Sequence, residues 1–271
     1  MNALRNSLEI WRLSGAGAGL RSRLLAFLCA RLVCLSERRR ILRTIIFHLI
    51  GCFAPNGQVK VSFHVAIRPL TILLRKDNKA DYLVFGEMVM GGYKLPDNFS
   101  ILPREAIDGG ANIGLFSLFA HAKFPNIKLT CYEPDKDNLA QLHKNLEANN
   151  IRAEVIPKAL WSKTAELFFH PGESYTGFVS AASSSYPISC VLPIVPDGCW
   201  LKLDIEAAEY EVLPALLETG AKPAIISMEI YDFNRRGNQL LSLLRTHGYQ
   251  WHEVFQPTEQ CVTICALKCN Q

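Results

Sequence analysis

The sequence predicts an α/β protein in which a mostly parallel sheet is covered by helices on both faces and carries an antiparallel C-terminal strand. From residue 105 onward, strand-like and helical segments alternate regularly, as they do in a parallel sheet with crossover helices. Two adjoining strand-like segments, 249–255 and 260–268, are expected to close the chain as a hairpin. A chain of 271 residues, 49% hydrophobic and 20% charged, is large and apolar enough for one such domain with an appended segment, or for two small domains.

The N-terminal residues 1–53 are predicted to be helical, in two amphipathic segments that separate near "SERRR". Residues 1–50 hold nine arginines against two glutamates, a net charge of +7, whereas the remaining residues have 20 basic and 23 acidic side chains. This segment is expected either to lie on an anionic membrane surface or to pack on the body with its arginines in solvent. Nucleic-acid binding is not expected, because few aromatic residues interleave with the basic ones.

The turn residues "APNG" at 54–57 mark the predicted boundary between a helical arm, 1–55, and a larger domain, 56–271. In the N-terminal extension of that domain, 56–104, "QVKVSFHVAIRPLTILL" alternates like a strand. The stretch "DYLVFGEMVMGGYKLP" is predicted to be a short helix that ends at Gly91–Gly92. The Rossmann-like core is expected at 105–271.

The core is predicted to begin with two strand–helix units. Asp135 is expected to cap the second of these helices. The predicted strands are 105–110, 127–134, 152–161, 165–170, 199–206, 224–231, 249–255 and 260–268. The predicted helices are 111–124, 135–150, 207–220 and 234–248, and a long loop is predicted at 171–187.

The cysteine content and the hydropathy pattern predict the cellular location of the protein. Nine cysteines, an odd number mostly in apolar settings, are typical of reduced thiols in a cytoplasmic protein. No segment is expected to span a membrane, and the first residues do not resemble a signal peptide. The four-residue spacing of Cys261, Cys265 and Cys269 places them on one face of a strand, so no metal site is expected.

A glycine-rich turn, "DGGANIG" at 108–114, follows the first core strand, where nucleotide-like ligands bind in open α/β sheets. Gly110 and Gly114 let the backbone approach a ligand closely. A dinucleotide fingerprint needs glycine where Ala111 stands, and the carboxylate of Asp108 would repel a pyrophosphate. S-adenosylmethionine (SAM) has no phosphate and carries a cationic amine and sulfonium, so the turn favours SAM.

Two further features fit a nucleoside beside this turn. Glu133 ends the next strand, where a carboxylate can accept hydrogen bonds from both ribose hydroxyls of SAM or of NAD. The alternative for Glu133 is a surface acid next to a turn proline. After the third strand, Ala159, Leu160 and Trp161 are candidates for the wall of an adenine site.

An acidic cluster at the ends of the later strands predicts the reaction site. Asp204 and Glu206 end one strand, Glu209 begins the following helix, and Glu229 lies at the end of the next strand. Buried carboxylates are costly unless they are used or solvated, and one of them could orient a substrate hydroxyl or accept its proton. For Glu209 the alternative is a favourable charge at a helix N-terminus.

Over about residues 58–267, the sequence resembles the FkbM family of SAM-dependent methyltransferases. "IDGGANIGLFSLFA" is similar to the family's first SAM-binding motif and "CYEPDKDNLAQLHKNL" to its second. "LKLDIEAAEYEVL" is similar to its D-I-E-G-A-E segment, and "DYLVFGEMVMGGYKLP" resembles the stretch before the SAM fold.

The resemblance implies a seven-stranded, Rossmann-like SAM-dependent methyltransferase fold that methylates oxygen, commonly a hydroxyl of a sugar, glycolipid or natural product. Asp204 and Glu206 would then line the reaction site. The SAM contacts it implies are Asp108, Gly110, Asn112, Gly114 and Glu133.

Two departures from the family pattern are visible. Ala207 stands where the family usually has glycine and is expected to tighten the space next to Glu206. Tyr231 stands where many members carry histidine, so a histidine base is missing there.

The expected acceptor is a small-molecule or glycan hydroxyl, and the loop 170–190, with Tyr175, Ser183, Ser184 and Tyr186, is expected to help select it. Two other functions stay open: a non-catalytic SAM-fold module bound to a membrane or partner, and an NAD-dependent oxidoreductase. The sequence does not identify the acceptor, the base or the oligomeric state.

Overall fold

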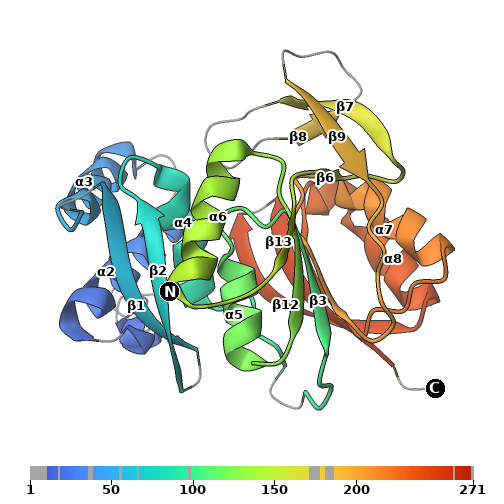
Figure 1. Cartoon of the computed structure of the whole chain (residues 1–271), viewed down its shortest axis with the longest axis horizontal. Helices are drawn as coiled ribbons and strands as arrows, with labels where there is room; N and C mark the ends of the chain where they lie inside the picture. The colour runs from blue at the N-terminus through green and yellow to red at the C-terminus, as the bar shows by residue number, and fades with distance from the viewer. Residues whose placement is uncertain are drawn as a thin grey trace.

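The computed structural model describes residues 11–17, 19–35, 39–54, 57–65, 67–96, 99–170, 178–180, 186–258 and 260–269. Its centre is a seven-stranded sheet in the order β12-β13-β11-β10-β3-β4-β5 (Figure 1). The strands are β3 (Glu105–Gly109), β4 (Lys128–Tyr132), β5 (Glu154–Ile156), β10 (Trp200–Leu203), β11 (Ile225–Ile230), β12 (Tyr249–Thr258) and β13 (Cys261–Lys268).

Six strands of this sheet run in one direction and β13 runs against them, inserted between β11 and β12. This is the Rossmann-like, mostly parallel sheet with an antiparallel C-terminal strand that the sequence predicts. The chain order reverses between β3 and β10, because β3 continues outward through β4 to β5 while β10 continues through β11 on the other side. Ligands bind at such a switch point, outside the carboxyl ends of the strands.

Helices cover both faces of the sheet (Figure 1). The helices α4 (Lys79–Met90), α5 (Leu115–Lys123) and α6 (Lys136–Ala148) belong to one apolar cluster, and α7 (Glu209–Glu218) and α8 (Asn238–Thr246) to the other. Successive strand residues alternate between the clusters, so the fully buried Trp200 packs on one face and Leu201 on the other. A π-helical turn, η3 (Phe233–Gly237), precedes α8.

The N-terminal residues form the far end of the molecule: η1 (Ser14–Ala16), α2 (Gly19–Val33), α3 (Arg40–Gly51) and an antiparallel hairpin of β1 (Gln58–Val65) and β2 (Arg68–Arg75). The alternating segment after residue 57 therefore makes two strands where the pattern indicated one. α2 packs closely on α4, because a side chain at Gly86 would overlap the backbone of Cys29. The helix α4 ends at Gly91 in the left-handed conformation, as predicted.

A four-stranded sheet that the sequence did not predict lies beyond the carboxyl ends of the central strands (Figure 1). It contains β6 (Ala159–Leu160), β7 (Ala165–His170), β8 (Phe178–Ser180) and β9 (Pro187–Val191), in the order β6-β9-β7-β8. The predicted strand 152–161 is thus divided between two sheets. Of the predicted acceptor loop, Tyr175, Ser183 and Ser184 lie outside the described residues.

None of the helices in the described part of the chain combines the length and apolar content needed to cross a bilayer. Asp135 caps α6 as expected, because its side chain accepts hydrogen bonds from the backbone N–H groups of Asp137 and Asn138.

Candidate functional site

The glycine-rich turn connects β3 to α5 at the switch point of the sheet. Gly110 and Gly114 have positive φ angles, +72° and +86°. A Cβ atom on Gly110 would overlap the carbonyl oxygen of Asp204, and one on Gly114 would overlap the side chain of Leu142. Both glycines therefore have a structural reason that does not depend on a ligand: β10 and α6 pass too close for a side chain.

Asp108 lies beneath this turn and is fully buried. One carboxylate oxygen accepts a hydrogen bond from the Ser117 hydroxyl at 2.7 Å, and the other lies 3.4 Å from the ammonium group of Lys202. The second oxygen has no hydrogen-bond partner among the described residues. The charge of Asp108 is thus partly balanced by the protein's own lysine, so its predicted contact with the SAM cation remains a prediction.

Glu133 connects the end of β4 to the glycine turn through hydrogen bonds. Its side chain accepts hydrogen bonds from the backbone N–H groups of Asn112 at 2.7 Å and Asp135 at 2.9 Å. Glu133 is only 5% exposed, which excludes the alternative of a surface acid. Burial raises its pKa to about 7, against the effect of these two hydrogen bonds. The oxygen bonded to Asp135 also accepts a hydrogen bond from the Asn138 side chain at 3.5 Å, whereas the oxygen bonded to Asn112 keeps a lone pair with which it can accept a second hydrogen bond.

Two more of the predicted cofactor residues lie near the same turn. Ala159 and Leu160 form β6 and are buried. Leu160 reaches the turn directly, because a side chain at Gly109 would collide with it. Asn112 has a positive φ of 50°, and its side-chain oxygen has no hydrogen-bond partner in the described part of the chain. The ends of β3 and β4 and Leu160 of β6 therefore meet at one turn, and the binding of a cofactor by these residues stays a prediction.

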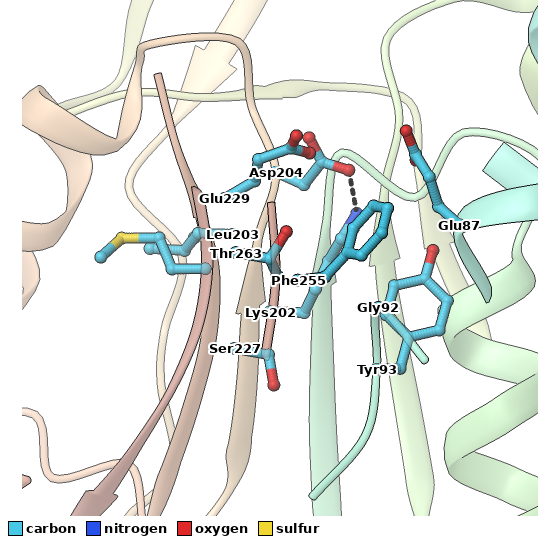
Figure 2. Close-up of a pocket in the computed structure, with 11 residues that line it drawn as sticks. Glu87, Gly92, Tyr93, Lys202, Leu203, Asp204, Ser227, Glu229, Phe255 and Thr263 are labelled. Carbon is cyan, nitrogen blue, oxygen red and sulfur yellow. Dashed lines mark ion pairs between the residues drawn. The ribbon is translucent and has the colours of Figure 1, made fainter. Parts of the chain in front are cut away.

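A pocket opens beside this turn, between the ends of β10 and β11 and the C-terminal end of α4 (Figure 2). Figure 2 shows Phe255 and Tyr93 flanking it, with Asp204 and Glu229 together at one end and Glu87 facing them. Its lining residues are Glu87, Gly92, Tyr93, Lys202, Leu203, Asp204, Ser227, Met228, Glu229, Phe255 and Thr263.

Lys202 joins the turn to the pocket. Its ammonium group donates a hydrogen bond to the carbonyl oxygen of Gly110 at 2.7 Å and lies 3.4 Å from carboxylate oxygens of both Asp108 and Asp204. Burial alone would lower the pKa of Lys202, but the two carboxylates outweigh it and raise the pKa. A permanently charged lysine therefore holds the glycine turn and Asp204 in one arrangement.

The pocket carboxylates repel one another. Burial and the charge of Asp204 raise the pKa of Glu87, and the same two causes hold the pKa of Glu229 well above its usual range. Protonated Glu229 donates a hydrogen bond to Asp204, and Glu229 accepts one from the Cys261 thiol at 2.8 Å. Among the pocket carboxylates of the described residues, Asp204 forms an ion pair, with Lys202, and 31% of its side chain is exposed.

Glu206 lies beside the pocket and does not line it. Burial and the charge of Asp204 raise the pKa of Glu206 to about 9, although a hydrogen bond with Tyr231 acts in the opposite direction. Ala207 is exposed and has a φ of +72°. The departure from glycine there therefore shows as backbone strain in addition to any crowding of Glu206.

Glu209 is fully buried at the first position of α7, where its side chain accepts a hydrogen bond from the backbone N–H of Tyr231. This contact ties the end of β11 to the start of α7 and fits the helix-terminus alternative for Glu209.

The sequence reasoning missed Lys202, Glu87, Tyr93 and Phe255. Two of them left a signal: Lys202 is a lone cation within the apolar strand "CWLKLD", and Glu87 is the one acid in "YLVFGEMVMGG". Phe255 enters the pocket through an irregularity in the pairing of β12 with β13, which sequence spacing does not show.

No family model matches the chain. Among curated proteins, the chain is 24% identical over 185 residues to the 31-O-demethyl-FK506 methyltransferase FkbM of Streptomyces tacrolimicus. The match covers 52% of this chain and 71% of that protein. The resemblance to FkbM family methyltransferases, stated above from four motifs, is confirmed by this relative.

Among solved structures, the chain is similar to the methyltransferase FkbM of Methylobacillus flagellatus, at 15% identity and a TM-score of 0.44. That match covers 97% of this chain and 59% of the other. It is also similar to precorrin-6y C5,15-methyltransferase of Geobacter metallireducens, at 16% identity and a TM-score of 0.40, covering 62% and 83% of the two chains.

Proposed function

We propose that this FkbM-type, SAM-dependent methyltransferase transfers the methyl group to a hydroxyl group of a sugar, glycolipid or natural product. The observation that carries the proposal is the position of Lys202, which contacts both the glycine turn and a pocket carboxylate. A cofactor at the turn and an acceptor in the pocket would therefore meet at the end of β10.

The residues at the turn fit SAM. The side-chain oxygen of Asn112 and one oxygen of Asp108 are buried acceptors without hydrogen-bond partners among the described residues, and one oxygen of Glu133 offers a further lone pair. SAM presents an amine and two ribose hydroxyls, all of them donors, whereas a pyrophosphate presents acceptors and negative charge. When bound, SAM supplies a methyl group made electrophilic by its sulfonium.

Asp204 is the residue best placed to accept the proton of the acceptor hydroxyl. It is a carboxylate at the pocket, and Lys202 fixes one of its oxygens. Glu206, with a pKa raised to about 9, is protonated at neutral pH and so is suited to donate a hydrogen bond. Glu229, whose pKa is also raised, holds Asp204 by the hydrogen bond between them.

Calorimetry and methyl transfer test this proposal together. We expect SAM to bind and NAD not to bind, and labelled SAM to give an alkali-stable methyl ether on a member of a panel of polyols, glycans and glycolipids. For Asp204→Asn we expect SAM affinity within a few-fold of the parent and turnover lower by ~10²-fold or more, the usual cost of losing a general base. Unchanged turnover in that variant would move the base elsewhere.

The two alternatives predict different results in the same experiment. A non-catalytic SAM-fold module would bind SAM and give no product on any acceptor. An NAD-dependent oxidoreductase would bind NAD, against the placement of the buried Asp108 beneath the turn, where its carboxylate would repel a pyrophosphate.

A further inference from the structure

The two helices of the N-terminal arm differ in how the protein covers their apolar side chains. In α2, Leu25, Ala26 and Cys29 are fully buried. In α3 the protein covers only one side, which includes Ile46 and Ile50. Four other apolar side chains of α3 are exposed: Ile41 (80%), Leu42 (40%), Ile45 (51%) and Leu49 (48%).

These four side chains form a continuous stripe. Residues 41, 45 and 49 are separated by four positions each, so they follow one another along the same side of the helix, and residue 42 lies next to them. About two and a half turns of helix thus present aliphatic side chains to solvent beside the side that packs on the body. A contiguous apolar stripe on an otherwise ordinary surface marks an interaction site.

The charge around the stripe identifies the partner. Neither α2 nor α3 contains an aspartate or glutamate, and residues 1–50 have a net charge of +7. Arg39, directly before α3, is exposed, and so is Arg21 of α2, which donates a hydrogen bond to the Phe53 carbonyl two residues after α3 ends. An apolar stripe flanked by arginines matches a bilayer surface with anionic lipids, where the arginines contact phosphates and the aliphatic side chains enter the acyl boundary. A second copy of the arm would bring two charges of +7 together.

We propose that α3 docks the protein on anionic phospholipid membranes, lying in the plane of the surface with Ile41, Leu42, Ile45 and Leu49 toward the acyl chains. The arm's two helices then have separate roles: α2 completes the core and α3 binds lipid. The pocket residues come from α4, β10, β11, β12, β13 and the segment after α4, so this surface is distinct from the candidate site.

Vesicle sedimentation of the full chain tests the proposal. We expect binding to phosphatidylcholine vesicles that contain phosphatidylglycerol, weaker binding to phosphatidylcholine alone, and release by salt. Ile45→Asp should reduce the partition coefficient about tenfold or more, because it places a charge at the centre of the stripe. Ile67→Asp is the matched control: Ile67 is 92% exposed in the turn between β1 and β2, away from α3, and its substitution should leave partitioning unchanged.

Both variants change exposed side chains, so thermal unfolding should match the parent and show that each is folded. Equal partitioning of Ile45→Asp and the parent, or no binding of the parent to either vesicle, would overturn the proposal. So would a parent that sediments as a dimer in the ultracentrifuge and becomes a monomer in Ile45→Asp, because a second copy would then cover the stripe.

Discussion

The glycine turn, where we propose that the cofactor binds (the cofactor side), and the pocket proposed for the acceptor (the acceptor side) differ in the surroundings of their carboxylates. On the cofactor side, Glu133 accepts two backbone hydrogen bonds, and Asp108 accepts one from Ser117. Burial raises the pKa of Glu133 to about 7 without a contribution from Asp204. On the acceptor side, burial and the charge of Asp204 together raise the pKa values of Glu87, Glu206 and Glu229. The cofactor side is therefore preformed by the fold. The acceptor side holds electrostatic repulsion that a bound substrate can relieve.

Lys202 lies between the two sides and serves both. It is the one cation within hydrogen-bond or ion-pair distance of the glycine turn, Asp108 and Asp204 among the described residues. Because a buried lysine without partners would be costly, its two carboxylates and the Gly110 carbonyl also explain how it is tolerated in a buried strand.

The largest effect we expect comes from the cofactor side. Gly110→Ala should lower the free energy of unfolding by more than about 3 kcal/mol. The new Cβ atom would overlap the carbonyl oxygen of Asp204, and alanine would have to adopt a left-handed backbone conformation. Gly198→Ala is the control, since Gly198 has a similar φ of +76° with open space around it. It should cost roughly 1 kcal/mol. Urea unfolding measures both; equal losses would mean that β10 does not restrict the turn.

The difference between the two sides also explains what the sequence could predict. The cofactor side is one strand–turn–helix unit and the end of the next strand, and local patterns identify such units well. Asp108, Gly110, Asn112 and Gly114 are neighbours in the chain, and the alternation of strands and helices placed Glu133 beside them.

The acceptor side depends on contacts between residues that are far apart in the chain. Glu87 reaches the pocket because α4 packs on α5 and α2, and no periodicity in the sequence encodes that packing. The second sheet was missed for a similar reason: its strands are two to six residues long, and β6 and β7 pair with β9, which follows them only after residue 186. Short strands have little pattern of their own.

Repulsion on the acceptor side should appear as a loss of stability with rising pH. A carboxyl whose folded pKa is raised contributes stability that is present below its unfolded pKa, near 4.3, and is lost as the pH approaches the folded value. For Glu206 that value is about 9. The free energy of unfolding of the ligand-free protein should therefore fall between about pH 5 and pH 9.

Glu206→Gln removes one of these titrating groups. The free energy of unfolding of the variant should therefore fall less steeply with pH than that of the parent, and the two slopes should differ by up to about 1.4 kcal/mol per pH unit. Chemical unfolding at pH 5, 7 and 9 measures the slopes, and Glu253→Gln, at an exposed position in β12, supplies the matched substitution. If the Glu206→Gln slope equals that of the parent, Glu206 does not take part in the repulsion.

The smallest effect tests the backbone of the acceptor side at the one position where the chain departs from the glycine of the FkbM pattern. Ala207→Gly should stabilise the protein by about 0.5–1 kcal/mol, because relief of a φ of +72° outweighs the entropy that glycine adds to the unfolded chain. Ala208→Gly is the neighbouring control: Ala208 has a φ of −72° and is only 4% exposed, so the same substitution should destabilise by about 1 kcal/mol through loss of a buried methyl group and added backbone freedom in the unfolded chain. Opposite signs in thermal unfolding would locate strain at Ala207, whereas two losses would mean that the methyl group of Ala207 makes contacts worth more than the strain. Glu206 and Ala207, both with positive φ angles, connect Asp204 to α7, so a stabilised Ala207→Gly protein with altered turnover would show that the pocket needs the strained turn.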